Sequence, residues 1–170
     1  MSATLVINGK APVVAYAELI AARVANSVAP GTVDVQFVDD KKLPAATFNG
    51  AAEGTFAAVV AAAVAAGASP LAAPATLVAD SERWAQTAAT ELVIKNFQKL
   101  SQSLEALDAQ LNLRTFVLGG LHYSSADIAC WGALRANGMC GSIIKNKVDV
   151  NVSRWYTLLE LDPLFGGAHE

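Results

Sequence analysis

Residues 121–136, LHYSSADIACWGALRA, restrict the fold more than any other part of the chain. Ser124, followed three residues later by Asp127, predicts a capping box at a helix start, with Asp in place of the usual Glu or Gln. Residues 128–134 carry no charged side chain, so this helix has no polar face to turn toward water. We therefore predict a helix that is buried on all sides, capped by Ser124 and Asp127, around which the other elements pack.

The N-terminal part of the chain has the pattern strand, helix, strand. Residues 5–7 are an apolar run that ends in an Asn-Gly turn, and residues 12–26 predict a helix with Pro at its first position. Residues 33–38 alternate between apolar and polar, which predicts a second strand. Two strands joined through a helix form a βαβ unit with a right-handed crossover. Residues 47–48 are the candidate for a third strand of the same sheet.

The rest of the chain is predicted to be helical. Alanine-rich residues 53–66 favour a helix, and residues 67–80, with Gly and two Pro, a mobile linker. Apolar residues recur every four or three positions over 93–111, which predicts one helical face. This spacing also fits a coiled coil, but the buried helix needs a partner within the chain. A last helix should begin near Asn151 and turn four apolar residues inward: Val152, Trp155, Tyr156 and Leu159.

Charge and hydropathy argue against nucleic-acid and membrane contacts. The 12 basic and 15 acidic residues give a net charge of −3, with no long run of either sign. The longest apolar stretch is residues 56–66, whereas a helix needs roughly 20 residues to cross a bilayer. Cys130 and Cys140 form no CxxC pair, and no secretory signal precedes them, so we expect reduced thiols. The sequence predicts a cytoplasmic chain with no direct nucleic-acid or membrane contact.

Two levels of resemblance follow from these motifs. A βαβ half joined to a helical half, whose central helix starts with the tetrapeptide SSAD at 124–127, resembles the glutathione-transferase fold. Residues 4–42 and 91–165 are similar to the N-terminal domain appended to fungal cytosolic glutamyl-tRNA synthetases, through stretches such as FVDDKK, ELVIKNFQKLSQSLEALDAQLNLRTFVLGGL and NVSRWYTLLELDP. The resemblance implies an α+β/α fold, with a degenerate thioredoxin-like subdomain and Ala-rich linker over 1–78 and an all-helical subdomain over 79–170.

The resemblance also implies a function. In that family the domain is not catalytic; it docks the synthetase onto a tRNA-binding aminoacylation cofactor protein with a glutathione-transferase-like domain, which also recruits methionyl-tRNA synthetase. ATP, glutamate and tRNA are then expected to bind only to a catalytic domain, whose HIGH and KMSKS-type motifs this chain lacks. We expect no cofactor and no metal in the domain itself, because its His, Cys and acidic residues do not cluster at ligand spacing.

The predicted partner interface lies on the last helix. The resemblance implies that Arg154, the arginine of the SRWY motif, is presented to the neighbouring protein. Arginine suits such a role because its planar, permanently charged head can stack on an aromatic ring and pair bidentately with a carboxylate. We expect Asn151, Thr157 and Leu158 to lie beside Arg154 and to complete the interface.

Two other functions stay open on the sequence. A glutathione transferase needs a Tyr, Ser or Cys after its first strand to stabilise the thiolate, and residues 8–11 are Asn-Gly-Lys-Ala. The pattern after Leu43-Pro44 also lacks the acid-Ser pair that grips glutathione, so binding of this peptide is disfavoured. The third reading is a homodimeric scaffold like the domains fused to translation elongation factors.

Overall fold

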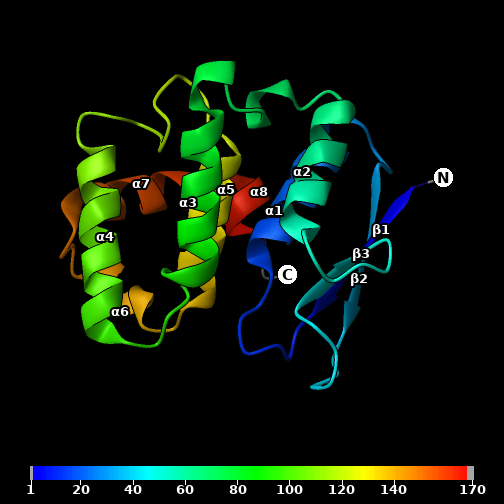
Figure 1. The fold of residues 1–170 in the computed structure, drawn as a ribbon, viewed down its shortest axis with the longest axis horizontal. Helices are drawn as coiled ribbons and strands as arrows, with labels where there is room; N and C mark the ends of the chain where they lie inside the picture. The colour runs from blue at the N-terminus through cyan, green and yellow to red at the C-terminus, as the bar shows by residue number, and fades with distance from the viewer. Residues whose placement is uncertain (1, 168–170) are drawn as a thin grey trace.

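A small sheet with two helices forms one end of the molecule, and a group of helices forms the other (Figure 1). This computed structural model describes residues 2–167. The strand order is β2-β1-β3, with β1 parallel to β2 and antiparallel to β3. The elements of this half are β1 (Ala3–Asn8), α1 (Tyr16–Val28), β2 (Val33–Val38), β3 (Ala46–Phe48) and α2 (Thr55–Ala65).

The predicted strands are all present, including the third one at β3, but the first helix begins later than expected. Pro12 does not start α1, which begins at Tyr16 after a loop of residues 9–15. The reason is tertiary: a chain leaving β1 must turn back across the sheet before its helix can pack there. Helices α1 and α2 both lie on the side of the sheet that faces the helical half (Figure 1).

The segment predicted as a mobile linker is packed against the molecule. It contains two single 3-10 turns, η1 (Ser69–Leu71) and η2 (Ala75–Leu77), and Leu71 is only 1% exposed. The next helix, α3 (Val78–Thr90), begins directly after the second turn. The burial of Leu71 supplies an apolar anchor that the alanine-rich composition conceals.

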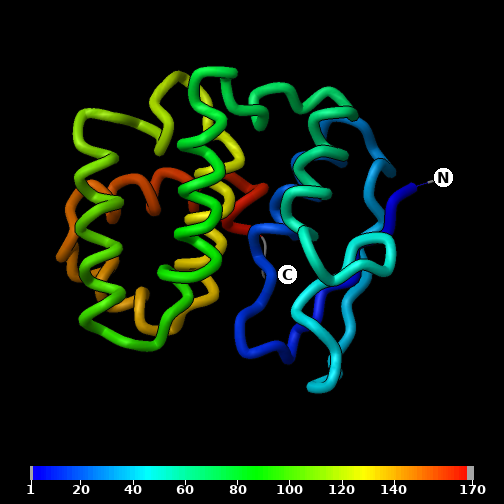
Figure 2. The backbone as a smooth tube through the Cα atoms, in the orientation of Figure 1, coloured from blue at the N-terminus to red at the C-terminus, as the bar shows by residue number. Residues whose placement is uncertain are grey.

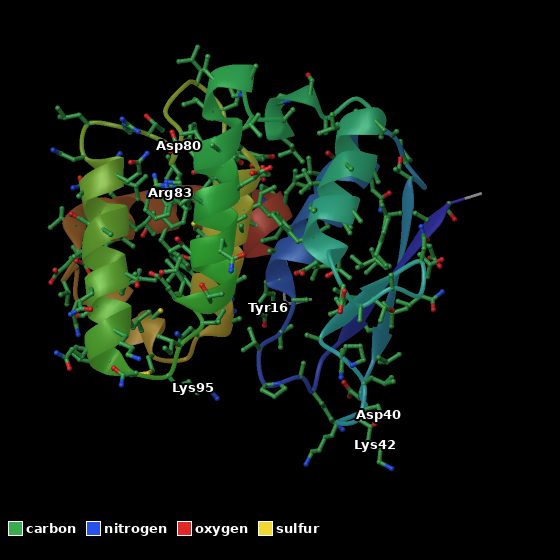
Figure 3. All side chains as sticks on the ribbon, viewed as in Figure 1. Tyr16, Asp40, Lys42, Asp80, Arg83 and Lys95 are labelled. Carbon is green, nitrogen blue, oxygen red and sulfur yellow. The ribbon has the colours of Figure 1, made fainter. Side chains whose placement is uncertain are left out.

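The helical face predicted over residues 93–111 begins four residues later than expected. Helix α4 (Phe97–Leu111) is separate from α3, and the loop between them contains Lys95 (Figure 3). The Asn96 side chain accepts a hydrogen bond from the Lys99 backbone N–H at 3.1 Å and so caps the new helix. The turn lets α4 pack inside the same chain, with Leu100, Leu104, Leu107 and Leu111 fully buried.

Helix α5 (Ser125–Ala136) is the centre of the helical half, as predicted. All residues from 126 to 134 are buried, and Ser124 with Asp127 forms the capping box. Around it lie α6 (Cys140–Lys145), α7 (Val150–Glu160) and α8 (Pro163–Gly166), of which only α7 was predicted. The inward residues predicted for α7 are all buried. None of the helices within residues 2–167 combines the length and hydropathy needed to cross a bilayer.

The two halves meet through α1, α5 and α8. Gly132 of α5 lies so close to Ala17 of α1 that an added Cβ would be 2.5 Å from the Ala17 backbone nitrogen. Phe165 of α8 is fully buried, with its ring edge-on to Trp131 at 5.4 Å and to Tyr123 at 5.0 Å. Figure 2 shows α8 returning to the junction beside α1. These contacts hold α5 and α8 in place, so the helices on the outer surface of the helical half pack against a rigid core.

Candidate partner-binding surface

Helix α5 sets the orientation of α7. The indole N–H of Trp155 donates a hydrogen bond to Asp127 Oδ1 at 2.8 Å, and that of Trp131 donates to the Tyr156 carbonyl at 3.2 Å. The rings of Trp131 and Tyr156 stack with centroids 4.9 Å apart. Because Trp155 and Tyr156 point into the core, the preceding residue Arg154 is turned toward solvent.

Asp127 does more than cap α5. Its carboxylate accepts hydrogen bonds from the Ser124 N–H at 2.9 Å, the Val117 N–H at 2.9 Å and the Trp155 indole at 2.8 Å. Burial raises the pKa of Asp127, and these hydrogen bonds oppose that shift. The sequence predicted the cap, but only the fold shows that the same carboxylate joins the cap, the preceding loop and α7.

Two charged side chains hold α7 against α4. Asp108 of α4 accepts hydrogen bonds from the backbone N–H groups of Asn151 and Val152 at 2.7 and 3.0 Å, and from the Asn151 amide at 3.1 Å. Arg154 donates through Nη2 to the carbonyls of Leu111 at 3.0 Å and Arg114 at 2.8 Å. A carboxylate thus caps the start of α7, and a guanidinium caps the end of α4.

The structure brings two of the four predicted interface residues together in one groove. Arg154 and Thr157 line a groove of about 820 Å³ between α6, α7 and the end of α5. Asn151 and Leu158 do not line it: the Asn151 amide is bonded to Asp108, while Leu158 is 42% exposed one turn beyond Arg154. Sequence reasoning missed the basic residues that the fold adds to the groove, which are Arg135, Lys145 and Lys147.

At the end of β1, next to the segment where a transferase needs a residue that stabilises the thiolate, this chain has a structural asparagine. Asn8 is 1% exposed, and its amide nitrogen donates to the carbonyls of Asp40 at 2.6 Å and Leu43 at 3.0 Å. Its amide oxygen accepts from the Lys10 N–H at 3.1 Å, and the Lys10 ammonium lies 3.8 Å from Asp39. The Asn8 side chain therefore fastens the loop after β2 and is not directed at a ligand.

Both cysteines are buried and unpaired. Burial raises the pKa of the Cys130 thiol and raises that of Cys140 to about 11. A raised pKa keeps a thiol protonated in the folded chain at pH 8, and the thiolate is the reactive form. Across the part of the chain that the structure describes, no three His, Cys, Asp or Glu side chains are placed to hold a metal ion.

We expect both thiols to resist modification in the native state. At pH 8 the folded chain should react with a disulfide reagent at least about a hundredfold more slowly than free cysteine, because both protonation and burial oppose attack. The same chain in 6 M guanidinium should react at both positions at the free rate, which provides the control. Reaction of either thiol at the free rate without denaturant would contradict the burial.

The chain is similar to parts of two larger yeast proteins, although no family model matches it. Cytoplasmic glutamate–tRNA ligase of Saccharomyces cerevisiae is 61% identical over 176 residues, which cover 100% of this chain and 23% of that protein. The probable cytoplasmic glutamate–tRNA ligase of Schizosaccharomyces pombe is 34% identical over 79 residues, covering 46% of this chain and 11% of that protein. The chain thus spans less than a quarter of the length of these curated relatives.

Solved structures agree with both levels of the predicted resemblance. A chain from the crystal structures of two binary sub-complexes of the yeast aminoacyl-tRNA synthetase complex is 62% identical with a TM-score of 0.92, covering 98% of this chain and 91% of that one. Glutathione S-transferase unclassified 2 from Bombyx mori has a TM-score of 0.72 at 16% identity, over 99% of this chain and 94% of that one. The latter likeness confirms the predicted glutathione-transferase-like fold. By its identity over its whole length, the chain belongs to the family of the N-terminal regions of yeast cytoplasmic glutamate–tRNA ligases.

Proposed function

We propose that this chain is a non-catalytic docking domain, which joins a cytoplasmic glutamyl-tRNA synthetase to a multi-synthetase complex. Its partner is the glutathione-transferase-like domain of a tRNA-binding aminoacylation cofactor protein, and methionyl-tRNA synthetase is reached indirectly through that protein. The chain itself contributes no ATP, glutamate or tRNA site. Two of its relatives are named cytoplasmic, which supports the same location for this chain.

The observation that carries the proposal is that Arg154 lies on the outer face of α7 while the inward face of this helix is packed firmly into the core. Arg154 is exposed, yet its buried neighbours Ser153 and Trp155 and its own hydrogen bonds to the end of α4 fix its position. An interface residue that is held in place before binding loses less entropy on association. The similarity to a chain solved in a synthetase sub-complex supports assembly rather than catalysis.

Replacement of Arg154 by Ala should weaken binding to the cofactor protein by about 2 kcal/mol or more, close to a 30-fold loss of affinity. The charged head that the partner would contact is removed, and the end of α4 loses its guanidinium cap. Isothermal titration of the chain with the purified cofactor protein measures the effect. Thermal denaturation of Arg154→Ala must be recorded beside it, so that a loss of binding is compared at temperatures where the variant is folded.

Lys99→Ala is the matched control, since Lys99 is an exposed cation near the start of helix α4 and does not line the groove. Its affinity should change by less than threefold. A folded Arg154→Ala variant that binds as tightly as the unaltered chain would rule out this docking face. Retention of the chain on immobilised glutathione would favour a transferase instead, and a dimeric mass without the partner would favour a homodimeric scaffold.

A further inference from the structure

The turn that follows α4 presents a leucine in an unusual way. Leu113 is 96% exposed and has a φ of +59°, which is the left-handed region. It lies directly after the C-cap residue Asn112, at the position where helices commonly place glycine. A leucine at this position carries backbone strain and leaves its side chain in water. Neither property helps the isolated chain to fold.

The same turn is held in place by the proposed docking residue. The Arg114 N–H donates to the Leu111 carbonyl at 3.1 Å, which closes the turn. Arg154 donates to the carbonyls of Leu111 and Arg114, so its hydrogen bonds bracket the exposed leucine on both sides. Leu113 is therefore fixed beside Arg154.

Two more exposed leucines continue this surface along α7. Leu158 and Leu161 follow Arg154 at intervals of four and three, which places all three on one side of the helix. They are 42% and 79% exposed. We define the α4–α7 ridge as the surface formed by these residues and the turn: Leu113, Arg114, Arg154, Leu158 and Leu161.

We propose that Leu113 is the apolar anchor of this ridge and inserts into an apolar socket, rimmed by carboxylates, on the partner domain. This inference rests on the proposed function and specifies the partner's surface. Charge determines the choice of partner: Arg114 and Arg154 flank Leu113, so complementary carboxylates must lie on the other chain. A second copy fits poorly, because a two-fold interface centred here would set these arginines against their own copies.

The test is a substitution that should raise stability and lower affinity together. Leu113→Gly relieves the left-handed strain and should raise the melting temperature by about 2 °C. It also removes the anchor, so affinity for the cofactor protein should fall about 30-fold or more by isothermal titration. A residue that served only to end α4 would show the gain in stability without the loss of binding.

Two controls separate the two effects. Lys147 has a φ of +53° and is exposed, so Lys147→Gly should raise the melting temperature by a similar amount, which shows what relief of the left-handed strain alone does to stability. Leu121 is 90% exposed outside the ridge, and Leu121→Ser should leave affinity unchanged. If Leu113→Gly binds within twofold of the unaltered chain while Arg154→Ala does not, the inference fails and the proposed function stands. If the unaltered chain does not bind the cofactor protein, both fail.

Discussion

Asp127→Ala should destabilise the chain by about 4 kcal/mol or more, a large part of the 5–15 kcal/mol typical of a folded domain. Asp127 is fully buried, and its carboxylate is the acceptor for the N–H groups of Val117 and Ser124 and for the Trp155 indole. Alanine leaves these three buried donors without their partner, and each unsatisfied donor costs about 1–3 kcal/mol. Urea denaturation followed by tryptophan fluorescence measures the loss.

Two variants show whether the network or only the helix cap is responsible. Ser124→Ala removes the side chain of the N-cap and should cost about 1 kcal/mol. Asp80→Ala, at an acid half exposed in the first turn of α3 (Figure 3), should change stability by less than about 0.5 kcal/mol. A cost for Asp127→Ala no larger than that of Ser124→Ala would mean that the bonds to Val117 and Trp155 contribute nothing. Because Trp155 neighbours Arg154, Asp127→Ala should also weaken partner binding.

Gly132→Ala should destabilise the chain by about 3 kcal/mol and lower its melting temperature by about 6–12 °C. The new Cβ would lie 2.5 Å from the backbone nitrogen of Ala17 and 2.8 Å from its Cα. Backbone atoms cannot rotate away, so α1 and α5 must separate and the contact between the two halves loosens. The gain in helix propensity, about 1 kcal/mol, does not offset this clash.

Gly141→Ala is the matched control for that substitution. Gly141 is also helical, in α6, and no atom lies within 4 Å of its added Cβ. It should leave stability unchanged or raise it by about 0.5–1 kcal/mol. If both glycine variants unfold at the same temperature, the close approach of α1 and α5 is not what holds the halves together. Differential scanning calorimetry of the two variants decides the matter.

Local signals in the sequence were sufficient for most of the elements. The alternation at β2 and the capping box at α5 each depend on neighbours within a few residues, and both predictions are confirmed. The same applies to the buried face of α7. The start of α4 was predicted four residues too early because the apolar spacing already includes Val93, while the cap by Asn96 carries little signal on its own. Helices α6 and α8 were missed because each has six residues or fewer.

The proposed docking surface could be predicted only in part. The SRWY motif identified Arg154, whose role at the interface stays a prediction, and the helical period correctly turned it outward. Its hydrogen bonds to Leu111 and Arg114 join residues about 40 positions apart in the chain, which no local pattern records. Leu113 gave no signal, because a leucine after a leucine-rich helix looks like one more core residue.

By itself, the sequence determined most of the helices and strands, which helix is central, and which family the chain resembles, because these depend on short-range spacing and on direct similarity of residues. The tertiary structure alone decided that Asp127 accepts hydrogen bonds from the helix cap, the preceding loop and α7, and that Gly132 lets α1 approach α5 closely. It alone also placed the hydrogen bonds of Arg154 on both sides of the exposed Leu113. Each of these depends on hydrogen bonds or contacts between distant residues, whose geometry exists only once the two halves have packed.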